Sequence, residues 1–194
     1  MKKLILVLFL IVVSTNSFSQ QCWKTVTSSA YNVIGISANG KLWAWGRNQY
    51  GQLGDGTTVE KLIPTQIGTA SNWAECAAGF NDSFAIKTNG TLWAWGRNLD
   101  GNHGDGTTNS KLIPTQIGTA SNWVKIAVSP NHYLAIKTNG TLWAWGRNSD
   151  GQLGDGTTVD KIVPTQIGTA TNWFSISAGN VTSLAIKSNG TLYG

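Results

Sequence analysis

A 50-residue period constrains the fold of this chain more than any other feature of its sequence. Three residue types recur at this interval: Trp23, Trp73, Trp123 and Trp173; Asp55, Asp105 and Asp155; Pro64, Pro114 and Pro164. The segment AIKTNGTLWAWGRN at 85–98 returns unchanged at 135–148. Periods of this size indicate solenoids, propellers or arrays, because a single unit cannot bury its own apolar faces.

Within one unit the hydrophobic pattern has the period of β-strands. In the second unit we expect strands at 73–78, 83–87, 92–95 and 112–117. The last of them contains Pro114, which suits an outer edge because proline lacks an N–H. Asn89-Gly90 predicts a two-residue type I′ hairpin, a turn that needs positive φ at both positions. Four short antiparallel strands per unit predict one β-propeller blade, and no helical period occurs after residue 20.

The N-terminal segment predicts export. Lys2 and Lys3 precede an apolar run at 4–13 that is too short to span a bilayer as a helix, and small and polar residues follow it. We therefore expect a signal peptide at 1–20, cleaved near Ser19 or Gln20. The mature chain at 21–194 would be secreted or displayed on the cell surface, with no membrane span.

Charge and cysteine content narrow the possible partners. Charged residues make up 12% of the chain, and its basic residues are spread out rather than clustered. Such a distribution does not neutralise a run of phosphates, so we expect no nucleic acid partner. The two cysteines, Cys22 and Cys76, fall at different repeat positions, which excludes a periodic disulfide framework. We expect Cys76 to be a buried thiol, because Ile126 and Ile176 occupy the matching positions.

The run LAIKTNGTLWAWGRNSDGQLGDGTT at 134–158 combines an alternating strand, an Asn-Gly turn, an aromatic-x-Trp-Gly strand and a GQLG loop. It resembles the repeat of the regulator of chromosome condensation superfamily, in its exported bacterial form. The resemblance covers 23–194 and implies an all-β, seven-bladed propeller of four-stranded antiparallel blades. About 3.5 blades are present at the usual one repeat per blade. The expected repeats are 23–72, 73–122, 123–172 and an incomplete 173–194.

Because the last repeat stops within a strand, we expect the sequence to be a fragment; the alternative is that two copies complete one ring. The family's histidine after the first strand is matched by His132 alone.

The repeated residues favour packing over chemistry. Pairs such as Trp93 and Trp95 are expected in the core between blades rather than as a sugar platform. Aspartates in the GDGTT loops, such as Asp105, are expected to form turns through hydrogen bonds to the main chain, with calcium as the alternative. The only histidines, His103 and His132, differ in repeat position, which predicts no catalytic site, cofactor or metal. We expect a protein that is not an enzyme.

The differences between units point to one face. In an antiparallel blade, the connection between the first and second strands (the A–B loop) and that between the third and fourth (the C–D loop) emerge on the same side. These loops vary among units, whereas the other connections barely change. Repeat arrays often bind through such a face. The predicted partner-binding residues are Tyr31, Tyr50, Phe80, Asn81, Asp82, Asp100, His103, Asn131, His132 and Tyr133.

These observations predict an exported interaction scaffold that binds a protein partner through its variable loops. The resemblance adds that an exported propeller of this kind can block an enzyme, as a bacterial β-lactamase inhibitor does. It does not justify transferring the nucleotide-exchange and chromatin roles of the family's namesake. The alternative function is a carbohydrate-binding propeller of the cell surface.

Overall fold

The computed structural model describes residues 21–194, and the predicted signal peptide at 1–20 lies outside them. The described chain is all-β and has no helix, so none of its segments crosses a membrane as a helix. Its strands are β1 (Trp23–Ser28), β2 (Asn32–Ser37), β3 (Leu42–Gly46), β4 (Lys61–Gln66), β5 (Trp73–Ala78), β6 (Asp82–Lys87), β7 (Leu92–Gly96), β8 (Lys111–Gln116), β9 (Trp123–Val128), β10 (His132–Lys137), β11 (Leu142–Gly146), β12 (Lys161–Gln166), β13 (Trp173–Ala178), β14 (Ser183–Lys187) and β15 (Leu192–Tyr193).

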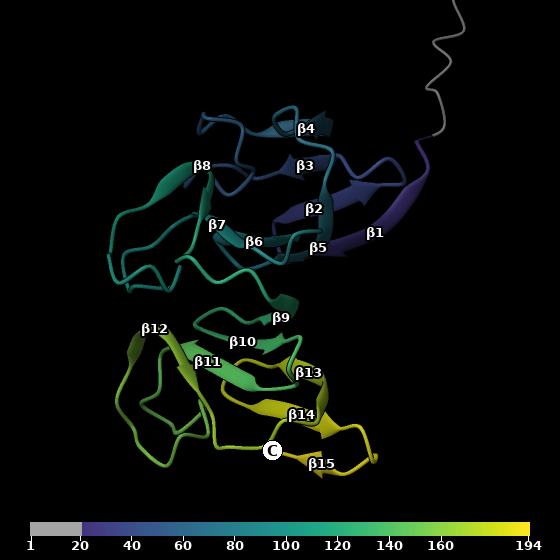
Figure 1. Cartoon of the computed structure of the whole chain (residues 1–194). Helices are drawn as coiled ribbons and strands as arrows, with labels where there is room; N and C mark the ends of the chain where they lie inside the picture. The colour runs from purple at the N-terminus through teal and green to yellow at the C-terminus, as the bar shows by residue number, and fades with distance from the viewer. Residues whose placement is uncertain (1–20) are drawn as a thin grey trace, which may run out of the picture.

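The strands form successive antiparallel sheets, each a propeller blade. Their strand orders are β1-β2-β3-β4, β5-β6-β7-β8, β9-β10-β11-β12 and β13-β14-β15. Figure 1 shows the blades succeeding one another from purple to yellow. The all-β, partial propeller of four-stranded antiparallel blades is thus confirmed, with three strands in the last described sheet.

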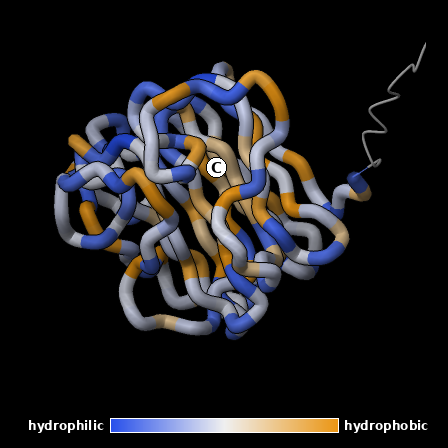
Figure 2. The backbone as a smooth tube through the Cα atoms, turned by 90° about the horizontal axis from the view of Figure 1, so that it is seen from above, coloured by the Kyte–Doolittle hydropathy of each residue, from blue (hydrophilic) through white to orange (hydrophobic). Residues whose placement is uncertain are grey.

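The first strand of each blade lies innermost and the fourth lies outermost. Neighbouring first strands contact one another along the chain, β1 with β5, β5 with β9, and β9 with β13. The outer strands β4, β8 and β12 pair on one side only, which confirms the edge position predicted for Pro114. Apolar residues are found on this outer rim as well as inside (Figure 2), for example the exposed Leu62 and Ile113.

In the second and third blades, the second tryptophan of the pair fills the interface with the preceding blade. Trp95 and Trp145 are fully buried, and their indole N–H groups donate to the main-chain oxygens of Gln52 and Asn102 in the preceding blade, at 2.9 Å each. The predicted position between blades is thus confirmed for Trp95 and Trp145. Cys76 is buried at such an interface as predicted, and burial raises the pKa of its thiol to about 12.

The first tryptophan of each pair lies at the margin of the core. Trp93 is partly exposed and meets Trp73 edge-on, with ring centroids 5.7 Å apart. The Nζ atom of Lys87 lies 3.9 Å from the Trp93 centroid and 4.8 Å from a Trp73 centroid. This cation–π contact joins β5, β6 and β7. Lys137 repeats it in the third blade.

The hairpin between β6 and β7 is not the predicted type I′ turn. Gly90 has φ of +74°, but no described residue other than glycine has a positive φ, so Asn89 does not. The Gly90 N–H donates to Lys87 O at 2.8 Å and the Lys87 N–H donates to Thr91 O at 3.0 Å, the pattern of a three-residue loop with a G1 bulge. Within this loop the Asn89 carboxamide oxygen accepts from the Thr91 N–H at 3.2 Å and from the Thr91 hydroxyl at 2.8 Å.

Candidate functional site

Two variable connections of each blade lie together on one face. The main-chain N–H groups of Arg47, Arg97 and Arg147 begin the C–D loops. They donate to the carbonyls of Tyr31, Asn81 and Asn131 in the A–B loops of the same blades, at 2.8 to 2.9 Å. We call the surface formed by residues 28–32, 78–82, 128–132 and 178–182 with the C–D loops 47–60, 97–110 and 147–160 the variable face.

The opposite face is held by main-chain hydrogen bonds between consecutive blades. The Trp73 N–H donates to Gly40 O at 3.1 Å, and the Trp123 N–H donates to Gly90 O at 2.9 Å. A Cβ on Gly90 would lie well under 3.0 Å from the Ser121 oxygen. This close main-chain packing explains why the hairpin turns and the links between blades hardly vary in sequence.

Four of the predicted partner-binding residues are buried and do not reach the surface of the variable face. Asp82, His103, His132 and Tyr133 are at most 2% exposed. Their variation among repeats reflects different packing solutions between blades rather than contact with a partner. Tyr133, for example, packs on Phe84 and stacks on the Trp145 indole, with ring centroids 4.8 and 5.7 Å away.

Asp82 and Tyr133 form a buried polar contact between the second and third blades. The Tyr133 hydroxyl donates to Asp82 Oδ2. Burial raises the pKa of Asp82 to about 7, although the Tyr133 hydroxyl and the charge of Arg97 act in the opposite direction. The pKa of Tyr133 is also raised, by burial and by the Asp82 carboxylate.

The two histidines serve as packing residues. His103 takes the place that Leu53 and Leu153 occupy in the neighbouring repeats and lies edge-on to Phe84, with centroids 6.3 Å apart. Burial lowers the pKa of His103 to about 4, so the ring is neutral near pH 7. Burial also lowers the pKa of His132, whose Nδ1 lies 2.8 Å from the Ser129 hydroxyl.

The other predicted residues reach the surface of the variable face. Tyr31, Tyr50, Phe80 and Asp100 are exposed, and Asn81 and Asn131 are partly exposed. The rings of Tyr31 and Phe80 meet at 5.0 Å between centroids. Phe80 also borders a hollow of about 410 Å³ at the centre of this face, lined in addition by Ala30, Pro130 and Asn180 among others.

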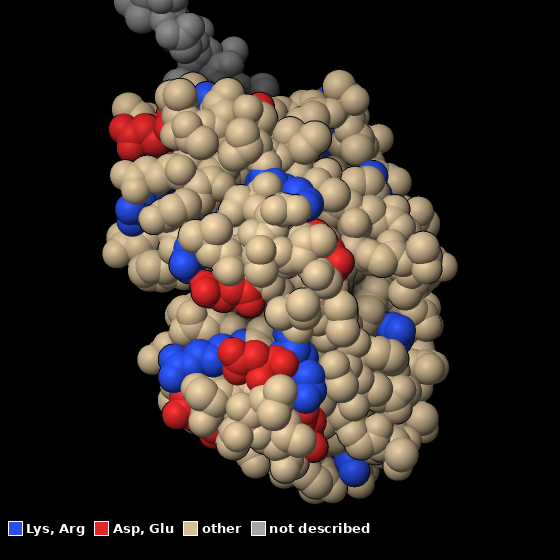
Figure 3. Space-filling model, turned by 90° about the vertical axis from the view of Figure 1, so that its left-hand side faces the viewer, with Lys and Arg blue, Asp and Glu red and all other residues tan. Residues whose placement is uncertain are grey.

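Sequence reasoning missed Arg47 as a candidate. Its Cζ atom lies 4.8 Å from the Tyr31 ring centroid. Because an arginine recurs at this place in every complete repeat, Arg47 looked structural. The available signal was its neighbour: Tyr50 stands where the other repeats have Asp100 and Asp150. Those two acids pair with Arg97 and Arg147 at 3.1 Å each, and Figure 3 shows basic and acidic side chains lying together on this side of the molecule.

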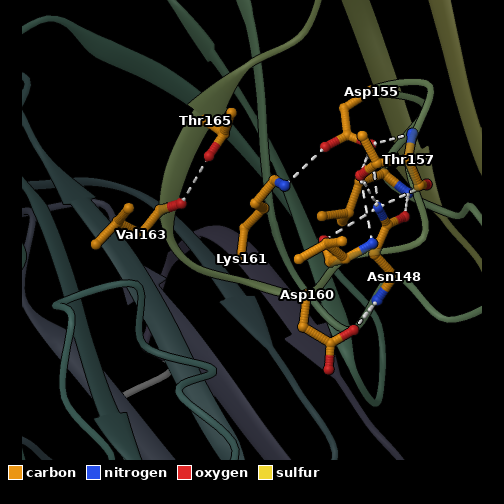
Figure 4. Close-up of polar contacts among 9 residues, drawn as sticks. Asn148, Asp155, Thr157, Asp160, Lys161, Val163 and Thr165 are labelled. Atoms are coloured by element: carbon orange, nitrogen blue, oxygen red, sulfur yellow. Dashed lines mark hydrogen bonds and ion pairs between the residues drawn. The ribbon is translucent and has the colours of Figure 1, made fainter.

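The GDGTT loops satisfy their carboxylates with protein groups (Figure 4). Asp155 accepts from the Thr157 N–H at 2.9 Å and hydroxyl at 2.8 Å, and from Asn148 Nδ2 at 3.0 Å, while Lys161 Nζ lies 3.2 Å away. Burial acts to raise the pKa of Asp155, but these contacts lower it to about 2. The turn interpretation is confirmed. In the described part of the chain no group of three or more acidic, histidine or cysteine side chains is placed to hold a metal.

Fold and loop arrangement together define a β-propeller of repeated blades with one variable face. The regulator of chromosome condensation (RCC1) repeat matches residues 39–86, 89–136 and 139–186, and a second description of the same repeat matches 23–52 and 123–152. The chain belongs to the RCC1 repeat family.

Solved structures of this fold resemble the chain over most of its length. Prp20p from Saccharomyces cerevisiae has a TM-score of 0.79 and 23% identity over 92% of this chain and 46% of its own. Yeast RCC1 (Prp20), in a structure with Kap60, has a TM-score of 0.77 and 24% identity over 91% of this chain and 44% of the other. Human WBSCR16 has a TM-score of 0.73 and 21% identity over 84% and 44%. The chain therefore spans a little under half the length of these structures.

Proposed function

We propose that this protein is an exported, non-enzymatic scaffold that binds a protein partner through its variable face. The observation that carries the proposal is the exposed Tyr31–Phe80 ring pair beside the central hollow. Aromatic side chains supply large contact area at low entropic cost and dominate many protein interfaces. The opposite face, by contrast, is committed to main-chain bonds between blades.

Structures of the same fold support a role in protein binding. The description of the Prp20p structure names binding to Gsp1p and histones, and another structure shows yeast RCC1 bound by Kap60. The partner of this chain need not be any of these, because identities of 23% and 24% reflect the fold alone. Export rests on residues 1–20, and N-terminal sequencing of the mature chain is expected to begin near Ser19 or Gln20.

A selection from a random dodecapeptide phage library on the purified chain tests the proposed face. The double variant Tyr31→Ala/Phe80→Ala should bind the selected peptides at least about tenfold more weakly, as expected when hot-spot aromatics are lost. A matched control, Thr88→Ala/Thr138→Ala, alters exposed residues on the opposite face and should bind normally. Both double variants must melt at the same temperature as the unaltered chain, so that a loss of binding is not a loss of folding. Equal binding by the two variants would refute the assignment of the face.

A carbohydrate-binding propeller is the second candidate, favoured by the exposure of Tyr31 and Tyr50. Against it, Phe80 contacts the Tyr31 ring and Arg47 lies over it, which leaves little open ring face for a sugar. A glycan array separates the two functions. Glycan binding that disappears in Tyr31→Ala and Tyr50→Ala would replace the protein-binding proposal.

A further inference from the structure

The first blade differs from the next two in the charge balance of its C–D loop. Arg97 and Arg147 each pair with an aspartate three residues later, at 3.1 Å. Tyr50 stands at the equivalent position of the first blade, and Arg47 donates instead to the neutral Gln49 Oε1. Within residues 21–194, the Arg47 guanidinium is therefore the one of the three without a carboxylate partner.

Aromatic contacts fix the position of the Arg47 charge without neutralising it. Arg47 Cζ lies 4.8 Å from the Tyr31 centroid, and the Tyr31 ring contacts Phe80 at 5.0 Å with an interplanar angle of 67°. A cation–π contact orders the guanidinium but leaves its N–H edge able to donate. The side chain is thus held in place, and the guanidinium N–H groups that do not donate to Gln49 can donate to an anion.

A hollow with a mixed wall of small, apolar and polar residues lies at the other end of this chain of contacts. Phe80 borders both the Tyr31 ring and the hollow of about 410 Å³, whose wall includes Ala30 and Pro130. The two ring steps limit the distance from Arg47 to Phe80 to about 10 Å, which an extended peptide covers in about three residues. A cation and a hollow bordered by Phe80, Ala30 and Pro130 are therefore within reach of one short segment.

We propose that this corner of the variable face binds an acidic peptide segment of the partner. A Glu or Asp carboxylate accepts hydrogen bonds from Arg47, and an aromatic or aliphatic side chain about three residues away enters the hollow beside Phe80. Paired hydrogen bonds between guanidinium and carboxylate supply the specificity. This inference rests on the proposed function and specifies the chemistry of its partner.

The test uses an immobilised hexapeptide library in which Glu and Phe are placed one to four residues apart, with Gln and Ala counterparts. The purified chain should prefer the Glu–Phe peptides about tenfold over their Gln–Phe counterparts, most strongly near three residues of separation. Arg47→Gln should abolish that preference. Tyr50→Asp should abolish it as well, because it supplies the internal carboxylate that Asp100 and Asp150 supply in the other blades.

Arg147→Gln is the matched control, since this arginine already has an internal partner; it should leave the preference unchanged. If Glu and Gln peptides bind equally, and Tyr31→Ala/Phe80→Ala still removes binding, the acidic specificity is wrong and the proposed face stands. If no variant alters peptide binding, both proposals fail. If the chain binds no peptide in this library, the proposal of an acidic peptide partner is wrong. The phage selection then tests independently whether the variable face binds a partner.

Discussion

The two faces of the propeller are stabilised by different parts of the chain. On the hairpin-turn face, main-chain groups of one blade bond main-chain groups of the next, as between Trp73 and Gly40. On the variable face, side chains pack beneath each A–B loop, at a place that we call the A–B corner. The residues that fill this corner differ from blade to blade. Constant sequence thus marks main-chain contacts between blades, and variable sequence marks side-chain solutions, only some of which reach solvent.

The A–B corners show how such solutions vary together. In the first blade the Ser29 hydroxyl donates to Asn32 Oδ1 at 2.6 Å. In the third, Ser129 is hydrogen-bonded to His132. In the second blade a glycine, Gly79, takes the place of the serine, and Asp82 Oδ1 lies where a Cβ on that glycine would project. The residue at the start of each A–B loop is therefore matched in size and hydrogen bonding to the residue three positions later.

The largest expected effect tests the constant face. Gly90→Ala should lower the free energy of unfolding by at least about 4 kcal/mol, because it combines left-handed strain with a collision against Ser121 O. Gly118→Ala, in the link between blades on the same face, has φ of +59° and nothing within 4 Å. It should cost only about 1 to 2 kcal/mol. Urea unfolding measures the loss of stability in both variants. Equal losses would show that close packing on this face is not the reason why residue 90 must be glycine.

A second test breaks the pairing in the A–B corner. Gly79→Ser should destabilise the protein by about 2 to 3 kcal/mol, because the new side chain meets the Asp82 carboxyl. Gly79→Ser combined with Asp82→Asn recreates the Ser29–Asn32 pair of the first blade and should recover at least half of that loss. Strictly additive costs in a double-mutant cycle would mean that the two positions are independent.

The third test concerns pH. Since burial raises the pKa of Asp82 from 3.8 to about 7, the folded protein holds this proton more tightly than the unfolded chain does. The free energy of unfolding should therefore fall as pH rises from about 4 to about 7, by about 1.4 kcal/mol per pH unit, and then level off. Asp82→Asn should flatten this slope, as read from urea unfolding at several pH values. Asp100→Asn, on the surface, is the control; if it flattens the slope equally, Asp82 is not the source.

The repeat made the blades predictable, because tryptophans at a fixed interval leave few ways to bury their rings. Trp95 and the edge proline Pro114 lie where the pattern placed them. Burial of individual corner residues was not predictable, since a tyrosine such as Tyr133 suits a surface as well as an interface until its Asp82 partner is known. Arg47 was missed for the opposite reason: its recurrence hid the loss of its acidic neighbour.

The lysine held between two indoles has a spectroscopic consequence. In the second blade Lys87 lies over Trp73 and Trp93, and in the third Lys137 lies over Trp123 and Trp143. In the first blade Ser37 replaces this lysine and accepts a hydrogen bond from the Trp43 indole at 3.3 Å. Opening a blade separates its own ammonium group from its own indoles. The fluorescence change on opening should therefore differ between the first blade, which lacks this lysine, and the second and third blades, which have it.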